Sequence, residues 1–244
     1  MAKICVDSAK HIFTNKLTTT LQKMFKYIHM LNLLFFDTKD FKSIQSAYRF
    51  RKKYPKMLID IRQIAFILRA LKGKFPCNML VFGLGWDSLM WTELNKGGRT
   101  IFIEDNSEWF KKIAGLCPWI EAYHVIYPTK ISDWECLLDK PDKLQIKLPF
   151  SINEVKWDVI FVDGPCGALE YYMSLYNKEP AGRMCSIYSA SKLIKKGGDV
   201  FVDDCQRIVE KEYADKYLRN HLVATLKSAT ILRWYRMEDI FEKR

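Results

Sequence analysis

The sequence contains no uninterrupted run of about twenty apolar residues, the length that a helix needs to cross a bilayer. The nearest candidate, residues 24–36, is short and is broken by Lys26, His29 and Asn32. No apolar core follows Lys3, so the opening residues do not form a secretory signal peptide. We therefore expect neither an anchor nor a leader in these residues, and this favours a cytoplasmic location.

Cysteine patterns typical of metal sites are missing. The seven cysteines are scattered and form no Cys-x-x-Cys pair, which argues against a zinc site. Their odd number also argues against a complete disulfide framework. We expect reduced, buried thiols, because free cysteine behaves as a small apolar side chain.

Acidic residues are scarce at the start of the chain. Residues 1–75 hold 16 Lys and Arg against 4 Asp and Glu, whereas the remaining residues hold 23 against 24. The net charge of +11 therefore arises in this leading segment, which is most basic at residues 49–56. Such a surface favours an acidic polymer, an anionic membrane or nucleic acid, with a solvated helix face as the simpler alternative. We predict a basic helical extension over residues 1–55 and one domain over residues 56–244.

Glycine is also infrequent, and two glycines stand in the segment around which the chain is organised. The apolar residues 79–82 precede Gly83 and Gly85, and an apolar run resumes after Asp87 and Ser88. This pattern predicts a buried strand, a tight turn and the start of a helix. Glycine permits such a turn to pass close to a ligand because it has no Cβ. We expect Asp87 or Ser88 to cap the helix.

A second predicted strand, residues 100–105, ends in Glu104 and Asp105. Glu104 lies about twenty residues beyond the glycines, the offset at which nucleotide-binding α/β units place a carboxylate on ribose hydroxyls. A dinucleotide site would have a third glycine where Ser88 stands, and the neighbouring Asp87 would repel phosphate. S-Adenosylmethionine has no phosphate and carries two positive groups, so it suits the acidic turn better. An ordinary strand-to-helix turn is the alternative.

The residues predicted to bind this cofactor share one property, since all lie at the ends of the first two strands. They are Gly83, Gly85, Asp87, Ser88, Glu104 and Asp105.

Two further apolar strands end in acidic residues. Residues 157–162 lead to Asp163, and residues 199–202 lead to Asp203 and Asp204. Helical segments separate the strands, which predicts a mostly parallel, doubly wound α/β sheet with ligands at the carboxyl ends of the strands. Several acidic strand ends at one rim favour a functional site over isolated turn residues.

The connecting segments complete the predicted fold. We expect an amphipathic helix over residues 57–71 and, after Pro165, a loop of about fifteen residues that is long enough to form a lid. A helix is predicted over residues 181–195, ended by the Gly197-Gly198 pair. Residues 222–235 are expected to form a closing antiparallel hairpin.

Six segments carry motifs that occur together in a known order. They are residues 77–91 (CNMLVFGLGWDSLMW), 98–104, 127–129, 157–165 (WDVIFVDGP), 181–184 and 204–211. Together they resemble the plant glucuronoxylan 4-O-methyltransferases and the related irregular-xylem proteins of polysaccharide biosynthesis, over about residues 60–236. The family's last parallel strand commonly ends in His-Asp, where this chain has Asp203 and Asp204.

The resemblance implies a Rossmann-like class I methyltransferase fold, S-adenosylmethionine as cofactor and a location in the Golgi. It implies a sugar hydroxyl as the acceptor, typically O4 of glucuronate on xylan, and an assisting divalent cation. The expected partner is therefore an acidic, glucuronoxylan-like polysaccharide.

Methyl transfer to an alcohol needs the oxygen, methyl and sulfur in line, and a group that takes up the hydroxyl proton. We predict that the carboxylates of Asp163, Asp203 and Asp204 are catalytic. Asp163 and Asp204 are the preferred bases or ligands of a divalent cation, because carboxylate oxygens suit Mg²⁺ or Mn²⁺.

Three further side chains are predicted to bind the substrate. The fork of Arg183 suits the glucuronate carboxylate, with a salt bridge at the start of a helix as the alternative. Tyr171 and Tyr172 are expected to stack on sugar or adenine, with a place in the core as the alternative.

Two other functions are compatible with these residues. A non-catalytic partner protein of polysaccharide assembly, with an eroded cofactor site, is favoured by the missing histidine. An RNA methyltransferase would use the basic leading segment, but base-stacking motifs are absent and we expect no nucleic-acid partner.

Overall fold

The structure, a computed structural model, describes residues 41–238. Its strands are β1 Asn78–Phe82, β2 Arg99–Glu104, β3 Glu121–His124, β4 Trp157–Val162, β5 Ile194–Val202, β6 Leu222–Lys227 and β7 Ile231–Arg236. Its α-helices are α2 Phe41–Lys53, α3 Ile61–Ala70, α4 Ser88–Leu94, α5 Ser107–Leu116, α6 Trp134–Leu137, α7 Phe150–Asn153, α8 Leu169–Tyr176, α9 Met184–Leu193 and α10 Ile208–Leu218. The helices expected before residue 41 lie outside the described residues.

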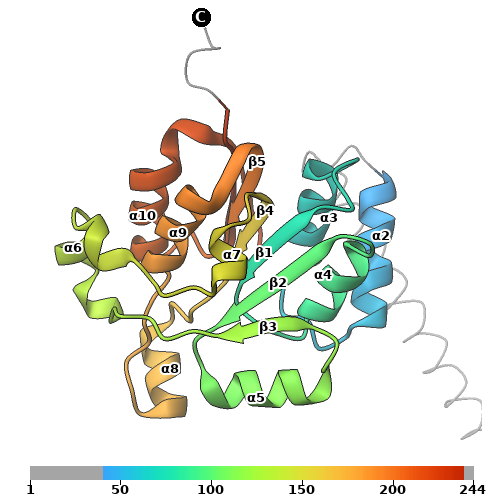
Figure 1. Cartoon of the computed structure of the whole chain (residues 1–244). Coiled ribbons are helices and arrows are strands. Elements are labelled where there is room, and N and C mark those ends of the chain that lie inside the picture. Colours follow the sequence, from blue (N-terminus) through green and yellow to red (C-terminus); the bar gives the residue numbers. More distant parts are fainter. Residues whose placement is uncertain (1–40, 239–244) are drawn as a thin grey trace, which may run out of the picture.

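The strands form one seven-stranded sheet in the order β3-β2-β1-β4-β5-β7-β6 (Figure 1). β1 to β5 are parallel neighbours, whereas β7 is antiparallel to β5 and forms a hairpin with β6. This confirms the predicted doubly wound sheet with a C-terminal antiparallel hairpin. The arrangement is that of a doubly wound, Rossmann-like α/β fold.

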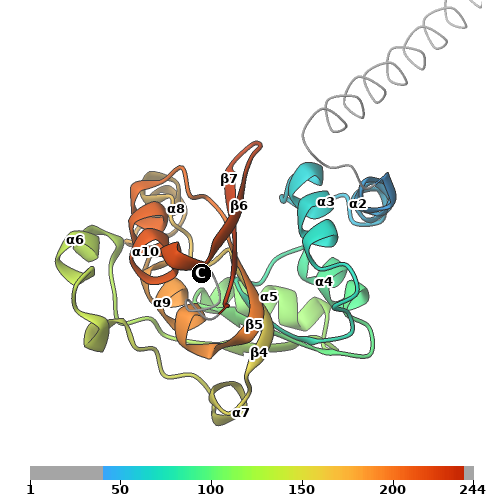
Figure 2. The same ribbon diagram turned by 90° about the horizontal axis from the view of Figure 1, so that it is seen from above.

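Helices cover both faces of the sheet (Figure 2). In β1, Met79 and Val81 pack into the apolar cluster built with α2 to α5, and Leu80 and Phe82 pack into the cluster built with α9 and α10. Successive residues of a strand point to opposite faces. A strand buried on both faces therefore has to be apolar at every position, as these four residues are.

The amphipathic helix expected from residue 57 begins later, at Ile61. Asp60 has extended backbone angles and accepts a hydrogen bond from the N–H of Arg62, and the side chain of Gln63 accepts one from the N–H of Asp60. This capping box sets the start of α3. α2, part of the predicted extension, lies beside α3, and its Ile44 is buried in the same cluster.

Two local predictions were wrong. The segment after Pro165 is not a long loop, because α8 occupies much of it and ends at Asn177 in the left-handed conformation. The Gly197-Gly198 pair lies inside β5 and does not end α9. The N–H of Gly197 donates to the carbonyl of Met237, whose N–H donates to Gly198, so pairing with the chain beyond β7 decides their conformation.

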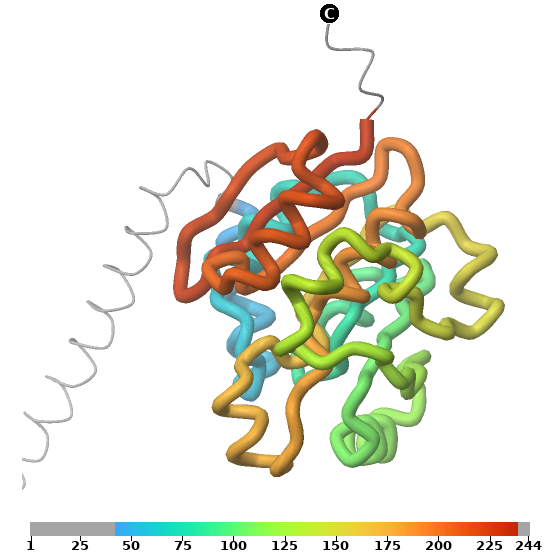
Figure 3. Tube along the Cα trace, turned by 90° about the vertical axis from the view of Figure 1, so that its left-hand side faces the viewer, coloured from blue at the N-terminus to red at the C-terminus, as the bar shows by residue number. Residues whose placement is uncertain are grey.

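The β6–β7 turn lies beside the start of α3, although the two are distant in sequence (Figure 3). The cysteines among residues 41–238 are free thiols; Cys77, Cys117, Cys185 and Cys205 are buried as expected, whereas Cys136 is exposed and Cys166 is half-buried. In the same range, no helix has the length and apolar character needed to cross a membrane.

Candidate functional site

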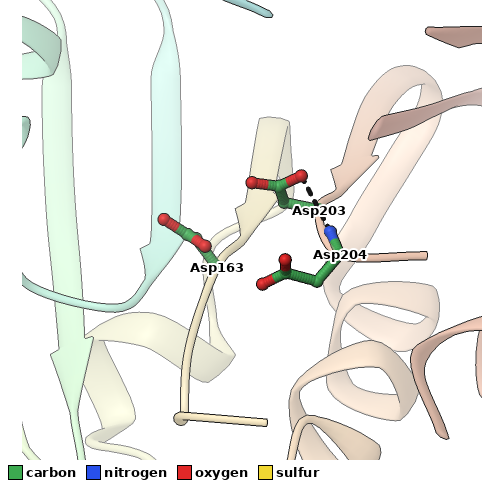
Figure 4. Close-up of side chains that lie close together, drawn as sticks. All are labelled: Asp163, Asp203 and Asp204. Atoms are coloured by element: carbon green, nitrogen blue, oxygen red, sulfur yellow. Dashed lines mark hydrogen bonds between the residues drawn. The ribbon is translucent and has the colours of Figure 1, made fainter. Parts of the chain in front are cut away.

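The ends of the central parallel strands bring the predicted acids together. Carboxylate oxygens of Asp163, which follows β4, and of Asp203 and Asp204, which follow β5, all lie within 4.8 Å of one another (Figure 4). β1 pairs with both β2 and β4, so the glycine turn and Glu104 share this rim of the sheet.

Gly83 and Gly164 let the ends of β1 and β4 touch. Gly83 has φ +117°, a conformation that other residues avoid. A Cβ on Gly164 would lie 2.7 Å from Cα of Gly83 and 2.9 Å from its nitrogen. These glycines are therefore required by backbone-to-backbone packing at the rim.

The rest of the turn is closed by its own side chains. The N–H of Gly85 donates to Oγ of Ser88 at 3.0 Å, and Nε1 of Trp91 donates to Oδ2 of Asp87 at 3.0 Å. Asp87 is the N-cap residue of α4, one of the two expected, but its side chain makes no capping hydrogen bond. Burial raises the pKa of Asp87, and the nearby Asp203 carboxylate acts in the same direction. Contact of the turn residues Gly83, Gly85, Asp87 and Ser88 with a cofactor stays a prediction.

Glu104 links the second strand to the glycine turn. Its Oε2 accepts the N–H of Leu84 at 3.0 Å, and its Oε1 accepts the N–H of Asn106 at 2.8 Å. Burial, with the neighbouring Asp105 carboxylate, raises the pKa of Glu104 to about 8. Burial also raises the pKa of Asp105. The Glu104 side chain also shares a hydrogen bond with the side chain of Asp105, so the two backbone N–H groups and Asp105 together hold its carboxyl.

Arg183 lies among the acids and is only 4% exposed. Its Nη2 lies 3.0 Å from Oδ1 of Asp163 and 2.7 Å from Oδ2 of Asp204. Nη1 donates to the carbonyl of Asp203 at 3.0 Å, and Nε donates to the carbonyl of Pro165 at 3.2 Å. All three nitrogens thus have internal partners, as in the salt-bridge alternative. Binding of a substrate carboxylate by Arg183 stays a prediction and requires one of these partners to be exchanged.

Arg207 and Glu210, which our site prediction missed, form a second layer. Nη1 of Arg207 lies 2.9 Å from Oδ2 of Asp204. The Glu210 carboxylate is fully buried, 3.6 Å from Arg207 and 3.9 Å from Nε of Arg183. Burial raises its pKa. The repeated spacing of three from Asp204 to Arg207 and from Arg207 to Glu210, at the start of α10, was the available signal.

Asp203 is held by neutral donors. Its Oδ1 accepts hydrogen bonds from Nε2 of Gln63 at 2.7 Å and from Oγ1 of Thr230 at 2.6 Å. The N–H of Asp204 donates to the same oxygen at 2.7 Å. Burial raises the pKa of Asp203, and the Thr230 hydroxyl opposes this. No sequence spacing pointed to Gln63 or Thr230.

Asp163 is the most exposed of the three acids, with a side chain 35% accessible. Burial nevertheless raises its pKa well above that of an ordinary carboxyl, against the lowering effect of Arg183. The Asp203 and Asp87 carboxylates add to the increase. The site is therefore suited to hold a proton or a cation.

The two predicted tyrosines differ in exposure. Tyr171 is 63% exposed on α8, whereas Tyr172 is 4% exposed. The hydroxyl of Tyr172 accepts a hydrogen bond from Nδ2 of Asn106 at 3.4 Å, and its ring lies 4.7 Å from that of Tyr176. Tyr172 thus contacts the residue that caps α5, and a stacking role for either tyrosine stays a prediction.

A family model described as IRX15/IRX15L/GXM matches residues 62–147 and 139–233, which is more than half of the chain. The chain belongs to this family. Glucuronoxylan 4-O-methyltransferase 1 of Arabidopsis thaliana is 40% identical over 179 residues, covering 65% of this chain and 61% of that protein. Arabinogalactan O-methyltransferase 2 of the same plant is 34% identical over 200 residues, 72% of this chain and 66% of that protein. The relatives of this chain are thus named for different acceptors.

The chain spans about three fifths of the length of the glucuronoxylan methyltransferases that it matches. Among solved structures, N-methyltransferase NodS from Bradyrhizobium japonicum is similar with a TM-score of 0.45 and 13% identity, covering 82% of this chain and 99% of that one. An RNA methyltransferase from Salinibacter ruber, in complex with S-adenosylhomocysteine, has a TM-score of 0.39 and 11% identity, covering 75% and 95%.

Proposed function

We propose that this family member is an S-adenosylmethionine-dependent O-methyltransferase whose acceptor is a sugar hydroxyl of an acidic polysaccharide, namely O4 of glucuronic acid on glucuronoxylan. The observation that carries the proposal is the convergence of the glycine turn, Glu104 and three aspartates at one rim of the sheet. The names of the most similar relatives support the choice of acceptor.

The residues at the rim fit the cofactor. The turn carries glycine at positions 83 and 85, and the buried Glu104 carboxyl, held at the end of β2 by two backbone N–H groups, would face the ribose hydroxyls. Gly83, Gly85, Asp87, Ser88, Glu104 and Asp105 would form the cofactor site. When bound, S-adenosylmethionine supplies a methyl group on a positively charged sulfur. The acidic residues of the turn would face its positive groups.

The aspartates would then take up the proton of the acceptor hydroxyl. An ordinary carboxylate is a weak base for a sugar hydroxyl. Burial raises the pKa values of Asp163 and Asp203 and so makes both carboxylates stronger bases. Acceptance of the hydroxyl proton by a carboxylate, late in the transfer, would neutralise the positive charge that builds on the sugar oxygen as it bonds to the methyl carbon.

A divalent cation is a second part of the proposal. The donor set consists of hard carboxylate oxygens within 4.8 Å of one another, which suits Mg²⁺ or Mn²⁺. Asp163 and Asp204 would hold the ion in exchange for part of their pairing with Arg183. A bound cation supplies Lewis acidity that lowers the pKa of a nearby hydroxyl. Calorimetric titration with Mn²⁺ tests this, and Asp163→Asn should abolish the binding heat.

The main test has two steps. Purified protein is titrated with S-adenosylhomocysteine, and is then incubated with S-adenosylmethionine and unmethylated glucuronoxylan, arabinogalactan or RNA. We expect binding that Glu104→Ala weakens, and methylation of the glucuronate-bearing polymers alone. Absence of binding, or binding that Glu104→Ala leaves unchanged, would contradict the proposal.

A non-catalytic role in polysaccharide assembly is the second candidate, favoured by Asp203 in the place of the usual histidine. Absence of cofactor binding, together with absence of transfer to any of the three polymers, would support it. We also propose that residues 1–55 form a basic extension to a catalytic domain over residues 56–244, and that the protein acts in the Golgi. A fluorescent tag on the full chain tests the location.

A further inference from the structure

The three aspartates differ in what holds them. Asp204 is paired with two guanidinium groups, those of Arg183 and Arg207, and its Oδ1 accepts from Nε2 of Gln206 at 3.0 Å. Within residues 41–238, Asp163 is paired with one guanidinium group, that of Arg183. The carboxylate of Asp203 is held by neutral donors through one oxygen. Asp203 is therefore the one of these three aspartates whose carboxylate is fixed by neutral donors through a single oxygen.

The second oxygen of Asp203 is available. Oδ1 receives three hydrogen bonds, whereas no hydrogen bond to Oδ2 is found among residues 41–238. Figure 4 shows Oδ2 turned toward Asp163, into the space between the ends of β4 and β5. One oxygen is therefore fixed, and the other points toward the centre of the acidic site.

The direction of every hydrogen bond in this network is determined. Oε1 of Gln63 accepts the N–H of Asp60 at 3.0 Å, so the amide nitrogen has to face Asp203. The same nitrogen lies 2.8 Å from Oγ1 of Thr230 and donates to it. The Thr230 hydroxyl therefore donates its own hydrogen bond to Oδ1 of Asp203. Such a network permits one orientation of the Asp203 carboxylate.

We propose that Asp203 is the catalytic residue that takes the acceptor's proton, and that Gln63 and Thr230 are positioning residues that aim its Oδ2. The inference rests on the proposed methyltransferase function. The acceptor oxygen forms a bond to the methyl carbon, and the carbon–sulfur bond breaks. Its electron pair leaves with sulfur as S-adenosylhomocysteine, and the hydroxyl proton moves to Oδ2 of Asp203.

The test uses the full chain and unmethylated glucuronoxylan. Thr230→Val removes the hydroxyl at nearly constant volume, and Thr230→Ser restores it. Thr225→Val on β6 is the matched control, since Thr225 is exposed on the same hairpin. We expect Thr230→Val to lower kcat on the order of tenfold or more. KM for the cofactor and Kd for S-adenosylhomocysteine should change less than about twofold, since the cofactor residues are untouched. Thr230→Ser should recover most of kcat.

Two further variants separate positioning from folding. Gln63→Met removes the donor to Asp203 at nearly constant side-chain length, so we expect a similar loss of kcat, and urea unfolding reports separately on the lost capping bond to the N–H of Asp60. In an Asp203→Asn background, Thr230→Val should cause no further loss of kcat, because the carboxylate that Thr230 orients is absent.

The outcomes are distinguishable. If the wild type is active and Thr230→Val has the same kcat, the positioning role is overturned and the methyltransferase function stands. The same conclusion follows if Thr230→Val lowers kcat as much in the Asp203→Asn background as in the wild type. A wild type that binds S-adenosylhomocysteine but methylates no acceptor would overturn both.

Discussion

Nε2 of Gln63 lies 2.7 Å from Oδ1 of Asp203, although 140 residues separate them in the sequence. Thr230, from the turn between β6 and β7, bonds to the same oxygen. The site is therefore completed by two elements outside the parallel strands, α3 and the β6–β7 turn. The hairpin and the helix before β1 are part of the architecture of the acidic site.

Cofactor binding should release a proton through Glu104. With a pKa of about 8, this carboxyl is mostly protonated at pH 7 in the free protein. Hydroxyl donors favour the ionised form, so binding of S-adenosylhomocysteine at pH 7 should release close to one proton. Calorimetry in two buffers of different ionisation enthalpy measures this number. In Glu104→Gln the heats should become buffer-independent, and equal heats in the wild type would contradict the expectation.

The same carboxyl predicts how stability depends on pH. The folded pKa of about 8 lies above the ordinary value of 4.5, so between these values the folded state holds more protons than the unfolded state. The contribution is fully present below about pH 4.5 and is lost as pH rises toward 8, with a slope of at most about 1.4 kcal/mol per pH unit. Urea unfolding at intervals across this range should show a weaker decline in Glu104→Gln than in the wild type.

Gly164→Ala should destabilise the protein. The new Cβ would meet the backbone of Gly83, which cannot yield as a flexible side chain would. We expect a loss of about 1–3 kcal/mol in the free energy of unfolding. Gly115→Ala on α5 is the control, since a Cβ there meets nothing within 4 Å. The control should gain about 0.5–1 kcal/mol, and a comparable loss in both variants would refute the packing explanation.

Arg183→Met should be strongly destabilising. It leaves the Asp163 and Asp204 carboxylates without a main counter-charge in a buried site, a change that costs about 3–5 kcal/mol. Arg99→Met removes an exposed pair with Glu121 and should cost about 1 kcal/mol or less. Urea unfolding of both variants checks the contrast. Similar losses would mean that the buried network is no more important than a surface pair.

Local patterns in the sequence were sufficient for the frame of the site. The apolar runs that lead to Gly83, Asp163 and Asp203 predicted buried parallel strands, because a strand covered on both faces needs apolar residues throughout. Parallel strands end at a common rim, so the proximity of Asp163 to Asp203 followed from strand order. The start of α3 was missed by four residues, since apolar periodicity extends past the Asp60 cap.

The tertiary structure alone decided the partners of the site residues. The Arg183 guanidinium is paired with Asp163 and Asp204 and donates to two carbonyls. The position of Arg183 in the sequence did not predict these partners. Gln63 meets Asp203 and Thr230 only because α3 and the hairpin pack against the sheet edge. Sequence spacing determines which residues share a strand or a helix face. Contacts between elements depend on how the elements pack, and the charge and hydrogen bonding of this acidic site arise there.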